Sequence, residues 1–448
     1  MEKCPTEIHA YIFELACTDG GAAGTALSAV SRYVRAISAP YQWYTLAVAG
    51  TTQTVRFAER IRTLSLSPTQ PAPATSADSE KGKGKTTGRG GPEITHLFVS
   101  NRSASRAREL RYQEMGATRD MAERRRIEAV FNAEADAWAR AVRVLFAYAA
   151  PTLRTLAMMC YDIHVSPNGR LFFSDLKRYR FPRLAELSIR GGFDTRLRDY
   201  DSAQHGEARA RMWEAADGEG DGGGRRHGGA AKEDEPTLPA LRRLHLASPI
   251  SFDLFLKRLL PLAPDLTHVR LSELLAFDYD MVRALHSEFA ERGIVPARLP
   301  RLRERQWSAE PRAVPVDWDR YLPPPGTLHR FVVQPAQLPP APEELCGCCS
   351  GYYRVDDMTR LLREMAREAV VLPEEDAPVY VFLPPGPRHN AYGFREGYRD
   401  WLGRAVGERG CWKEQDEVDI DAKAVVAGAD AKAQSWDVVG RRSRSRWF

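Results

Sequence analysis

The sequence lacks the short motifs that mark the most common catalytic and nucleotide-binding sites. It contains no GxxxxGK(S/T) loop for phosphates, no HExxH metal-binding helix and no GxSxG nucleophile turn. The glycine-rich stretch at 218–229 has neither a strand pattern before it nor a helix start after it, which indicates a linker rather than a phosphate-binding loop. We therefore expect a protein with no enzymatic activity of its own and no cofactor.

Cysteine is sparse, with seven in 448 residues. Four are far apart in the chain: Cys4, Cys17, Cys160 and Cys411. An odd, scattered set is typical of a reducing compartment rather than of a disulfide framework. Cys346, Cys348 and Cys349 form a cluster, but His329 and His389 are isolated and no second pair lies at ligand spacing. We therefore expect no metal site.

A strong charge of one sign is also missing. The chain has 64 Lys and Arg against 59 Asp and Glu, a net charge of +5. A dedicated nucleic-acid-binding protein is expected to show a strongly basic domain or stripe, so nucleic acid is an unlikely partner by this criterion. The basic run at 441–446 leaves two interpretations open, a nuclear-localisation or nucleic-acid patch and a disordered tail.

Long apolar runs are absent as well. The longest, at 144–159, contains Pro151 and Arg154, so we expect no membrane span. The first, at 8–16, is interrupted by polar residues and lacks a basic start, so we expect no signal peptide. These absences predict an intracellular protein, cytoplasmic or nuclear.

Composition divides the rest of the chain into units. Segments 68–92 and 214–236 are rich in Pro, Gly, Ser and charge, and they contain too little apolar surface to offset the entropy of ordering. We expect both to be flexible insertions. The predicted units are an N-terminal helical module at 1–46, a strand–helix region at 47–310, a C-terminal capping region at 311–412 and a disordered tail at 413–448. Within the capping region we expect strands at 328–333 and 379–383, and helices at 358–370 and 395–404.

One pattern, Leu-x-x-Leu-x-Leu with aliphatic substitutions, recurs through the strand–helix region. Six copies begin at Ile61, Ile94, Leu153, Leu184, Leu241 and Leu266. Each copy predicts a short strand whose alternate residues face a core. Apolar stripes at 127–146, 252–260 and 281–289 predict helices between the strands. Strand–helix units repeated at roughly 25–33 residues are typical of a leucine-rich-repeat solenoid. Ordinary strand–helix units of another α/β fold remain the alternative.

The N-terminal module shows two short amphipathic helices. Pro5, Thr6 and Glu7 favour the start of the first. Its apolar face is formed by Ile8, Ile12 and Leu15, and the second helix carries Leu27, Val30, Val34 and Ile37 before Pro40. Some forty residues bury too little surface to be stable alone, so this module needs a partner or the following repeats.

Four groups of residues in this module match one known motif. They are Pro5-x-Glu7-Ile8, Ile12-Phe13-x-Leu15, Leu27-x-x-Val30-Ser31-Arg32-Tyr33-x-Arg35 and Pro40-x-x-Trp43. Together they resemble the F-box motif. The whole chain, through ELCGCCSG and the stretch 392–412, resembles fungal F-box-type proteins with a degenerate leucine-rich-repeat body. The chain departs from the motif at Cys4, where the family usually has Leu, and in the glycine-rich loop 18–25.

The resemblance implies a substrate receptor of a cullin–RING (SCF-type) ubiquitin ligase. Helices of this kind dock a Skp-family adaptor, while the repeat body captures a protein substrate. The residues implied at the adaptor interface are Pro5, Glu7, Ile8, Ile12, Phe13, Leu27, Val30 and Arg32. Two alternatives remain: these residues cap the first repeat, or the chain is a stand-alone leucine-rich-repeat scaffold with a decayed F-box and no role in ubiquitin transfer.

A second candidate surface lies on the strands. Between the apolar positions of the last three strand copies stand Glu186, Ser188, Arg190, Arg243, His245, His268 and Arg270. In a solenoid these side chains face outward on the concave side, and the five basic or titratable ones predict a preference for an acidic or phosphorylated protein. These five are Arg190, Arg243, His245, His268 and Arg270. A plain solvated strand face is the alternative.

Overall fold

The computed structural model describes part of the chain. The described residues are 4–66, 92–103, 120–161, 171–172, 176, 178–191, 193–194, 236–247, 259–274, 329–335, 379–382, 392–408 and 410–412. Apart from a few residues at their ends, the predicted insertions and the predicted helices at 252–260, 281–289 and 358–370 lie outside the described residues. The cysteine cluster at 346–349 and the predicted tail at 413–448 lie outside them as well.

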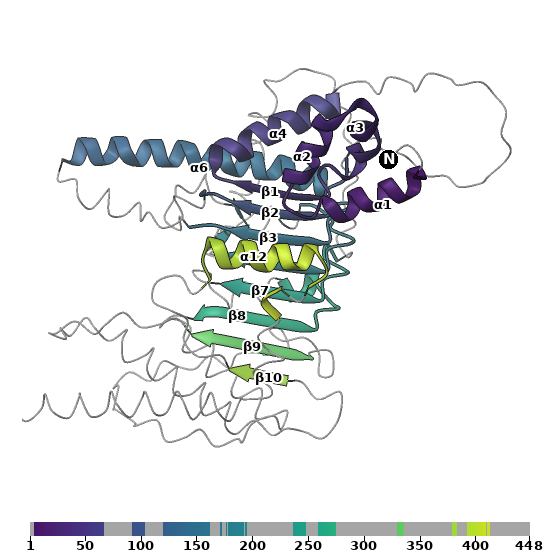
Figure 1. Cartoon of the computed structure of the whole chain (residues 1–448). Helices are drawn as coiled ribbons and strands as arrows, with labels where there is room; N and C mark the ends of the chain where they lie inside the picture. Colours follow the sequence, from purple (N-terminus) through teal and green to yellow (C-terminus); the bar gives the residue numbers. More distant parts are fainter. Residues whose placement is uncertain are drawn as a thin grey trace, which may run out of the picture.

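The centre of the structure is an eight-stranded sheet in which every pair is parallel and the strands follow chain order. The strands are β1 (Thr45–Ala49), β2 (His96–Ser100), β3 (Thr155–Met159), β5 (Glu186–Arg190), β7 (Arg243–Ala247), β8 (His268–Leu274), β9 (Arg330–Pro335) and β10 (Val379–Phe382). Figure 1 shows them as a ladder that grows one strand at a time away from the N-terminal helices. A separate two-stranded sheet pairs β4 (Leu171–Phe172) with β6 (Phe193–Asp194). The mixed α/β prediction is confirmed.

Two columns of apolar side chains define one face of the sheet. In strand register, the first column is Leu46, Leu97, Leu156, Leu187, Leu244, Val269 and Phe331. The second is Val48, Val99, Met158, Ile189, Leu246, Leu271 and Val333. All of these side chains are buried in one core. Because a one-residue slip would move a whole strand's apolar set to the other face, the repeated pattern fixes the register.

The predicted strand copy at Ile61 is wrong, because Leu64 and Leu66 belong to helix α4 (Thr51–Leu66). Ile61 is 2% exposed and Leu64 is 46% exposed, as expected for two faces of a helix. The first strand is instead β1, whose matching apolar positions are Trp43, Leu46 and Val48. The sheet therefore starts at Thr45, one residue before the predicted end of the helical module at 46.

The N-terminal module forms three helices where the sequence predicted two. They are α1 (Thr6–Ala16), α2 (Ala22–Val30) and α3 (Arg32–Ser38), followed by the 3-10 turn η1 (Ala39–Tyr41). Ser31 is extended, with φ −161° and ψ 166°, and its hydroxyl accepts a hydrogen bond from the Val34 amide at 3.1 Å. The predicted second helix is therefore split by an N-cap in its middle.

The two faces of the sheet have different covers. On the face of the apolar columns pack α4 and the long helix α6 (Met121–Ala149), with the 3-10 turn η3 (Leu260–Leu262) further along. Only the second half of α6, from Trp138 on, is buried, and Figure 1 shows its first half extending past the sheet. None of the described helices is both long and apolar enough to cross a membrane.

The opposite face, called the inner face below, is covered by residues 392–412. This C-terminal segment contains α12 (Phe394–Ala405) and the 3-10 turn η7 (Gly410–Trp412). Tyr392, Trp401, Cys411 and Trp412 form a second apolar cluster with sheet side chains, among them Phe98. Figure 1 shows α12 lying across the middle of the sheet. The predicted helix at 395–404 is confirmed, but it covers a face of the sheet and does not cap its end, and β9 and β10 of the predicted capping region extend the sheet.

Candidate functional site

The N-terminal helices present an apolar surface to solvent. Six large side chains on them are about half exposed or more: Ile8 48%, Tyr11 60%, Ile12 49%, Leu15 57%, Val30 66% and Tyr33 48%. We call these six residues the helical patch. Ile8 and Ile12 are one helical turn apart, as are Tyr11 and Leu15, so α1 carries most of the patch. A patch of this kind on a small unit is typical of a protein-binding surface.

Seven of the eight residues implied at the adaptor interface are at least partly accessible. Pro5, Glu7, Ile8, Ile12, Val30 and Arg32 are exposed, and Leu27 is half-buried. Phe13 differs: its side chain is only 4% exposed and lies inside the module, where its ring stacks on His9 at 6.2 Å between centroids. His9 in turn contacts the Tyr33 hydroxyl, with 3.1 Å from Nδ1 to the oxygen. Phe13 is therefore a core residue of the module and is removed from the interface.

The basic face expected on the strands does not point into solvent. Arg190 is 7% exposed, His245 1% and Arg270 4%, while Arg243 and His268 are half-buried. The expectation of an outward-facing surface is wrong at these positions, because the C-terminal segment packs over the inner face. The segment is separated from these strands by more than a hundred residues of sequence, so the sequence pattern of the strands could not indicate that it covers them.

Glu186 is the centre of the contacts between the C-terminal segment and the sheet. Its carboxylate lies 2.6 Å from Arg404 Nε of α12 and 3.8 Å from Arg243 Nη1 of β7. The Trp412 indole donates to it from Nε1 at 3.3 Å. Burial raises the pKa of the Glu186 carboxyl, and the two arginines oppose that shift. The carboxylate thus binds one guanidinium and one indole of the C-terminal segment.

The direction of a second carboxylate on the inner face, that of Glu273, is set by a β-bulge. The register between β8 and β9 shifts between Ser272 and Leu274, and Glu273 between them has a φ of 62°. Bulges of this kind redirect a side chain. The Glu273 carboxylate accepts the Tyr392 amide at 3.0 Å and pairs with Arg190 at 3.5 Å. Burial raises the pKa of Glu273, and Arg190 opposes this.

His245 lies between two hydroxyls on the inner face. Its Nε2 is 2.9 Å from Ser272 Oγ and its Nδ1 is 3.4 Å from Ser188 Oγ, while the Tyr392 ring covers it edge-on at 4.2 Å. Burial, with Arg270 nearby, lowers the pKa of His245 well below its ordinary value. Because the imidazole is almost fully buried, it orders the inner face and is not accessible to a substrate.

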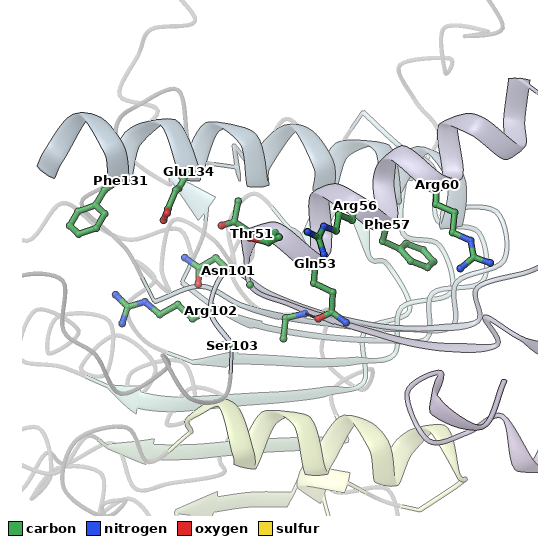
Figure 2. Close-up of a pocket in the computed structure, with 13 residues that line it drawn as sticks. Thr51, Gln53, Arg56, Phe57, Arg60, Asn101, Arg102, Ser103, Phe131 and Glu134 are labelled. Atoms are coloured by element: carbon green, nitrogen blue, oxygen red, sulfur yellow. Dashed lines mark hydrogen bonds between the residues drawn. The ribbon is translucent and has the colours of Figure 1, made fainter. Parts of the chain in front are cut away.

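The structure also contains a cavity that the sequence analysis missed. It has a volume of about 750 Å³ and lies at the carboxyl ends of β1 and β2, between α4 and α6. Figure 2 shows its lining: Thr51, Gln53, Arg56, Phe57 and Arg60 from α4, Asn101, Arg102 and Ser103 from the segment after β2, and Phe131 and Glu134 from α6. The signals in the sequence were Gly50 at the end of a strand and two threonines at the start of a helix.

Two of the three arginines that line this cavity, Arg60 and Arg102, contact different aromatic rings. Arg60 and Arg102 lie at opposite ends of it in Figure 2. Arg60 packs over the Trp43 ring at 5.4 Å, and Arg102 lies 5.7 Å from the centroid of the Tyr161 ring. Both guanidiniums are thus engaged with aromatic rings. These two arginines therefore do not form an anion cradle, in which several donors point to one site.

Metal binding finds no support in the part of the chain that the structure describes, where no three His, Cys, Asp or Glu side chains are grouped to hold an ion. The cysteines that the structure describes, Cys4, Cys17, Cys160 and Cys411, do not form disulfides. In comparisons with known proteins, no family model, no curated protein and no solved structure matches this chain.

Proposed function

We propose that this protein is a non-enzymatic substrate receptor of a cullin–RING ubiquitin ligase. It docks a Skp-family adaptor through α1, α2 and α3 and holds a protein substrate with its sheet-based body. The observation that carries the proposal is the helical patch, whose six apolar side chains are exposed on a module of some forty residues. Three of the seven accessible residues that match the F-box motif, Ile8, Ile12 and Val30, belong to this patch.

The body is proposed to be a leucine-rich-repeat-like solenoid. Three features support it: the strands are all parallel, they follow chain order, and two apolar columns run through seven of them in register. A repeat architecture stacks similar units so that each contacts only its neighbours, and this sheet has that pattern of pairing.

The test is binding of the full-length chain to a purified Skp-family adaptor. Ile8→Asp with Ile12→Asp places two charges in the helical patch and leaves the buried Phe13 in place, so the module is expected to remain folded. We expect this double variant to weaken adaptor binding by about a hundredfold or more, as for charged changes at the centre of an interface. Leu64→Asp is the matched control, because Leu64 is equally exposed, at 46%, on α4. Wild-type chain that fails to bind the adaptor at micromolar concentrations contradicts the proposal.

The second candidate is a stand-alone repeat scaffold, and the packing of the helical module against the sheet favours it. The Thr45 hydroxyl donates to the Cys17 carbonyl, and the Ala47 amide donates to the Gly20 carbonyl at 3.2 Å. These contacts join the module to the first strand as a terminal cap would be joined. In that case the same binding experiment shows no adaptor affinity, although the chain still captures its protein partner.

A further inference from the structure

The two faces of the sheet are buried to similar depth but differ in chemistry. The face under α4 and α6 buries only apolar side chains at the column positions. The inner face buries ionisable groups, all less than 10% exposed: His96, Glu186, Arg190, His245, Arg270 and Glu273. Burying a charge costs free energy even when it is paired, and replacing a buried ion pair by apolar residues is often neutral or stabilising. If the C-terminal segment only completed the apolar core, the inner face would not need these buried ionisable side chains.

Three of these ionisable groups, Glu186, Arg270 and Glu273, contact polar groups of the C-terminal segment. Glu186 holds the Arg404 guanidinium and the Trp412 indole. Arg270 donates from Nη1 to the Cys411 carbonyl. Glu273 accepts the Tyr392 amide at the other end of the segment. The sheet therefore recognises a short segment by an arginine, an indole N–H and backbone groups, as peptide-binding surfaces do.

The contacts between segment and sheet have the form of docking rather than of strand pairing. Each of the polar contacts just described uses a side chain from at least one partner, and the parallel strand ladder does not depend on them. A segment held in this way can leave the sheet without breaking its strand-to-strand hydrogen bonds. Such local opening requires less free energy than global unfolding.

We propose that the inner face is a peptide-binding site that the chain's own residues 392–412 occupy. When the segment leaves, the site accepts a protein segment that presents an arginine and an indole or similar N–H donor to Glu186 and a backbone carbonyl to Arg270. This inference rests on the substrate-capture half of the proposed function. It also changes the chemistry of the expected partner, because the residues that meet the ligand include the carboxylates of Glu186 and Glu273.

The first test is native-state hydrogen exchange of the wild-type full-length chain, which needs no variant. We expect the amides of α12 to exchange through openings at least about tenfold more frequent than those that expose β3 and β5. If α12 exchanges only together with these strands, through global unfolding, the segment is a fixed part of the core and the proposal is overturned.

The second test uses a fluorescent synthetic peptide with the sequence of residues 392–412 and the full-length chain. We expect saturable binding that the unlabelled peptide competes. A peptide with Arg404→Ala should compete about thirtyfold or more weakly, because it removes the guanidinium that lies nearest the buried Glu186 carboxylate. A peptide with Arg399→Ala is the matched control, because Arg399 is exposed on the same helix, and it should compete like the wild type.

In the protein itself, Glu186→Gln should make the openings that expose the α12 amides more frequent in hydrogen exchange, while adaptor binding, measured in parallel, stays unchanged. Absence of saturable peptide binding, or equal competition by the Arg404→Ala and Arg399→Ala peptides, overturns the inference. Loss of adaptor affinity together with normal peptide exchange would instead contradict the proposed ligase role and leave the peptide site standing. The two failures are therefore distinguishable.

Discussion

The clearest pH effect is expected at His96 in β2. The imidazole is 7% exposed, its Nδ1 lies 2.8 Å from Thr155 Oγ1, and the Tyr44 ring packs edge-on at 5.3 Å. Burial, with smaller contributions from the nearby Arg154 and Arg404, lowers the pKa of His96 from its ordinary 6.5 to about 4. His96 is thus neutral in the folded protein throughout the mildly acidic range.

The sign and size of the effect follow from linkage. Between pH 6.5 and 4 the unfolded chain binds a proton at His96 and the folded chain does not, so stability falls as the pH falls. With these two pKa values, lowering the pH from 7.5 to 5 removes about 2 kcal/mol of unfolding free energy at this one residue. The raised pKa of Glu186 acts in the opposite direction, because the folded state takes up that proton before the unfolded state does.

Comparison of the wild type with His96→Gln isolates the histidine from these other groups. The glutamine amide can still donate to Thr155, and it does not titrate. Urea unfolding of both proteins at pH 7.5 and pH 5 should show a loss smaller by about 2 kcal/mol in the variant. Equal losses in the two proteins would refute the reasoning, because they would mean that His96 takes up a proton in the folded state as easily as in the unfolded one.

Two further predictions concern stability. Phe13→Ala should lower the unfolding free energy of the helical module by about 3–5 kcal/mol, as for a buried aromatic, whereas Ile12→Ala on the exposed face should change it by less than about 0.5 kcal/mol in thermal or urea unfolding. Gly191→Ala should be strongly destabilising, because φ is +62° and the new Cβ would lie 2.5 Å from the Cys160 carbonyl oxygen. Gly407→Ala, with φ +87° and no atom within 4 Å of the Cβ, should cost only about 1–2 kcal/mol of backbone strain. Similar losses for both glycine variants would show that the contact at Gly191 is not the cause.

The apolar columns were predictable because each strand carries its own copy of the signal. A residue such as Leu187 has apolar neighbours at spacings of two and three in the sequence, and these spacings repeat at Leu244. The parallel pairing of the two strands then places the copies side by side. No long-range information is needed for this step, so five of the six predicted copies correspond to strands.

The failure at Ile61 has a physical cause in the pattern itself. Two apolar residues three apart, such as Ile61 and Leu64, fit a helix as well as a strand end. The true first strand, β1, has alanine at positions 47 and 49, and alanine is depleted in strands. Its burial comes from α4 and α6, which pack on Leu46 and Val48. Tertiary packing decides the assignment here.

The inner face could not be read from the strands alone. A charged residue such as Glu186 between two apolar ones is the ordinary sign of a solvated strand surface. Its partner Arg404 is more than two hundred positions later, and nothing near either residue indicates the pair. The aromatic residues of the C-terminal stretch, such as Trp401 and Trp412, were the available clue, since so many large rings in a terminal segment need a surface to cover.

The C-terminal segment also contacts the N-terminal helical module of the proposed receptor. The Tyr398 hydroxyl of α12 donates to the Asp19 carbonyl at 3.5 Å, and a Cβ at Gly20 would lie 2.9 Å from the same hydroxyl. Asp19 and Gly20 belong to the glycine-rich loop between α1 and α2. Gly20 has a φ of +85°, which residues with a side chain rarely adopt, and a Cβ there would crowd the Tyr398 hydroxyl. When the C-terminal segment leaves the inner face, it must break this contact as well. Helix α12 therefore contributes both to the occupancy of the proposed peptide site and to the packing of the N-terminal helices.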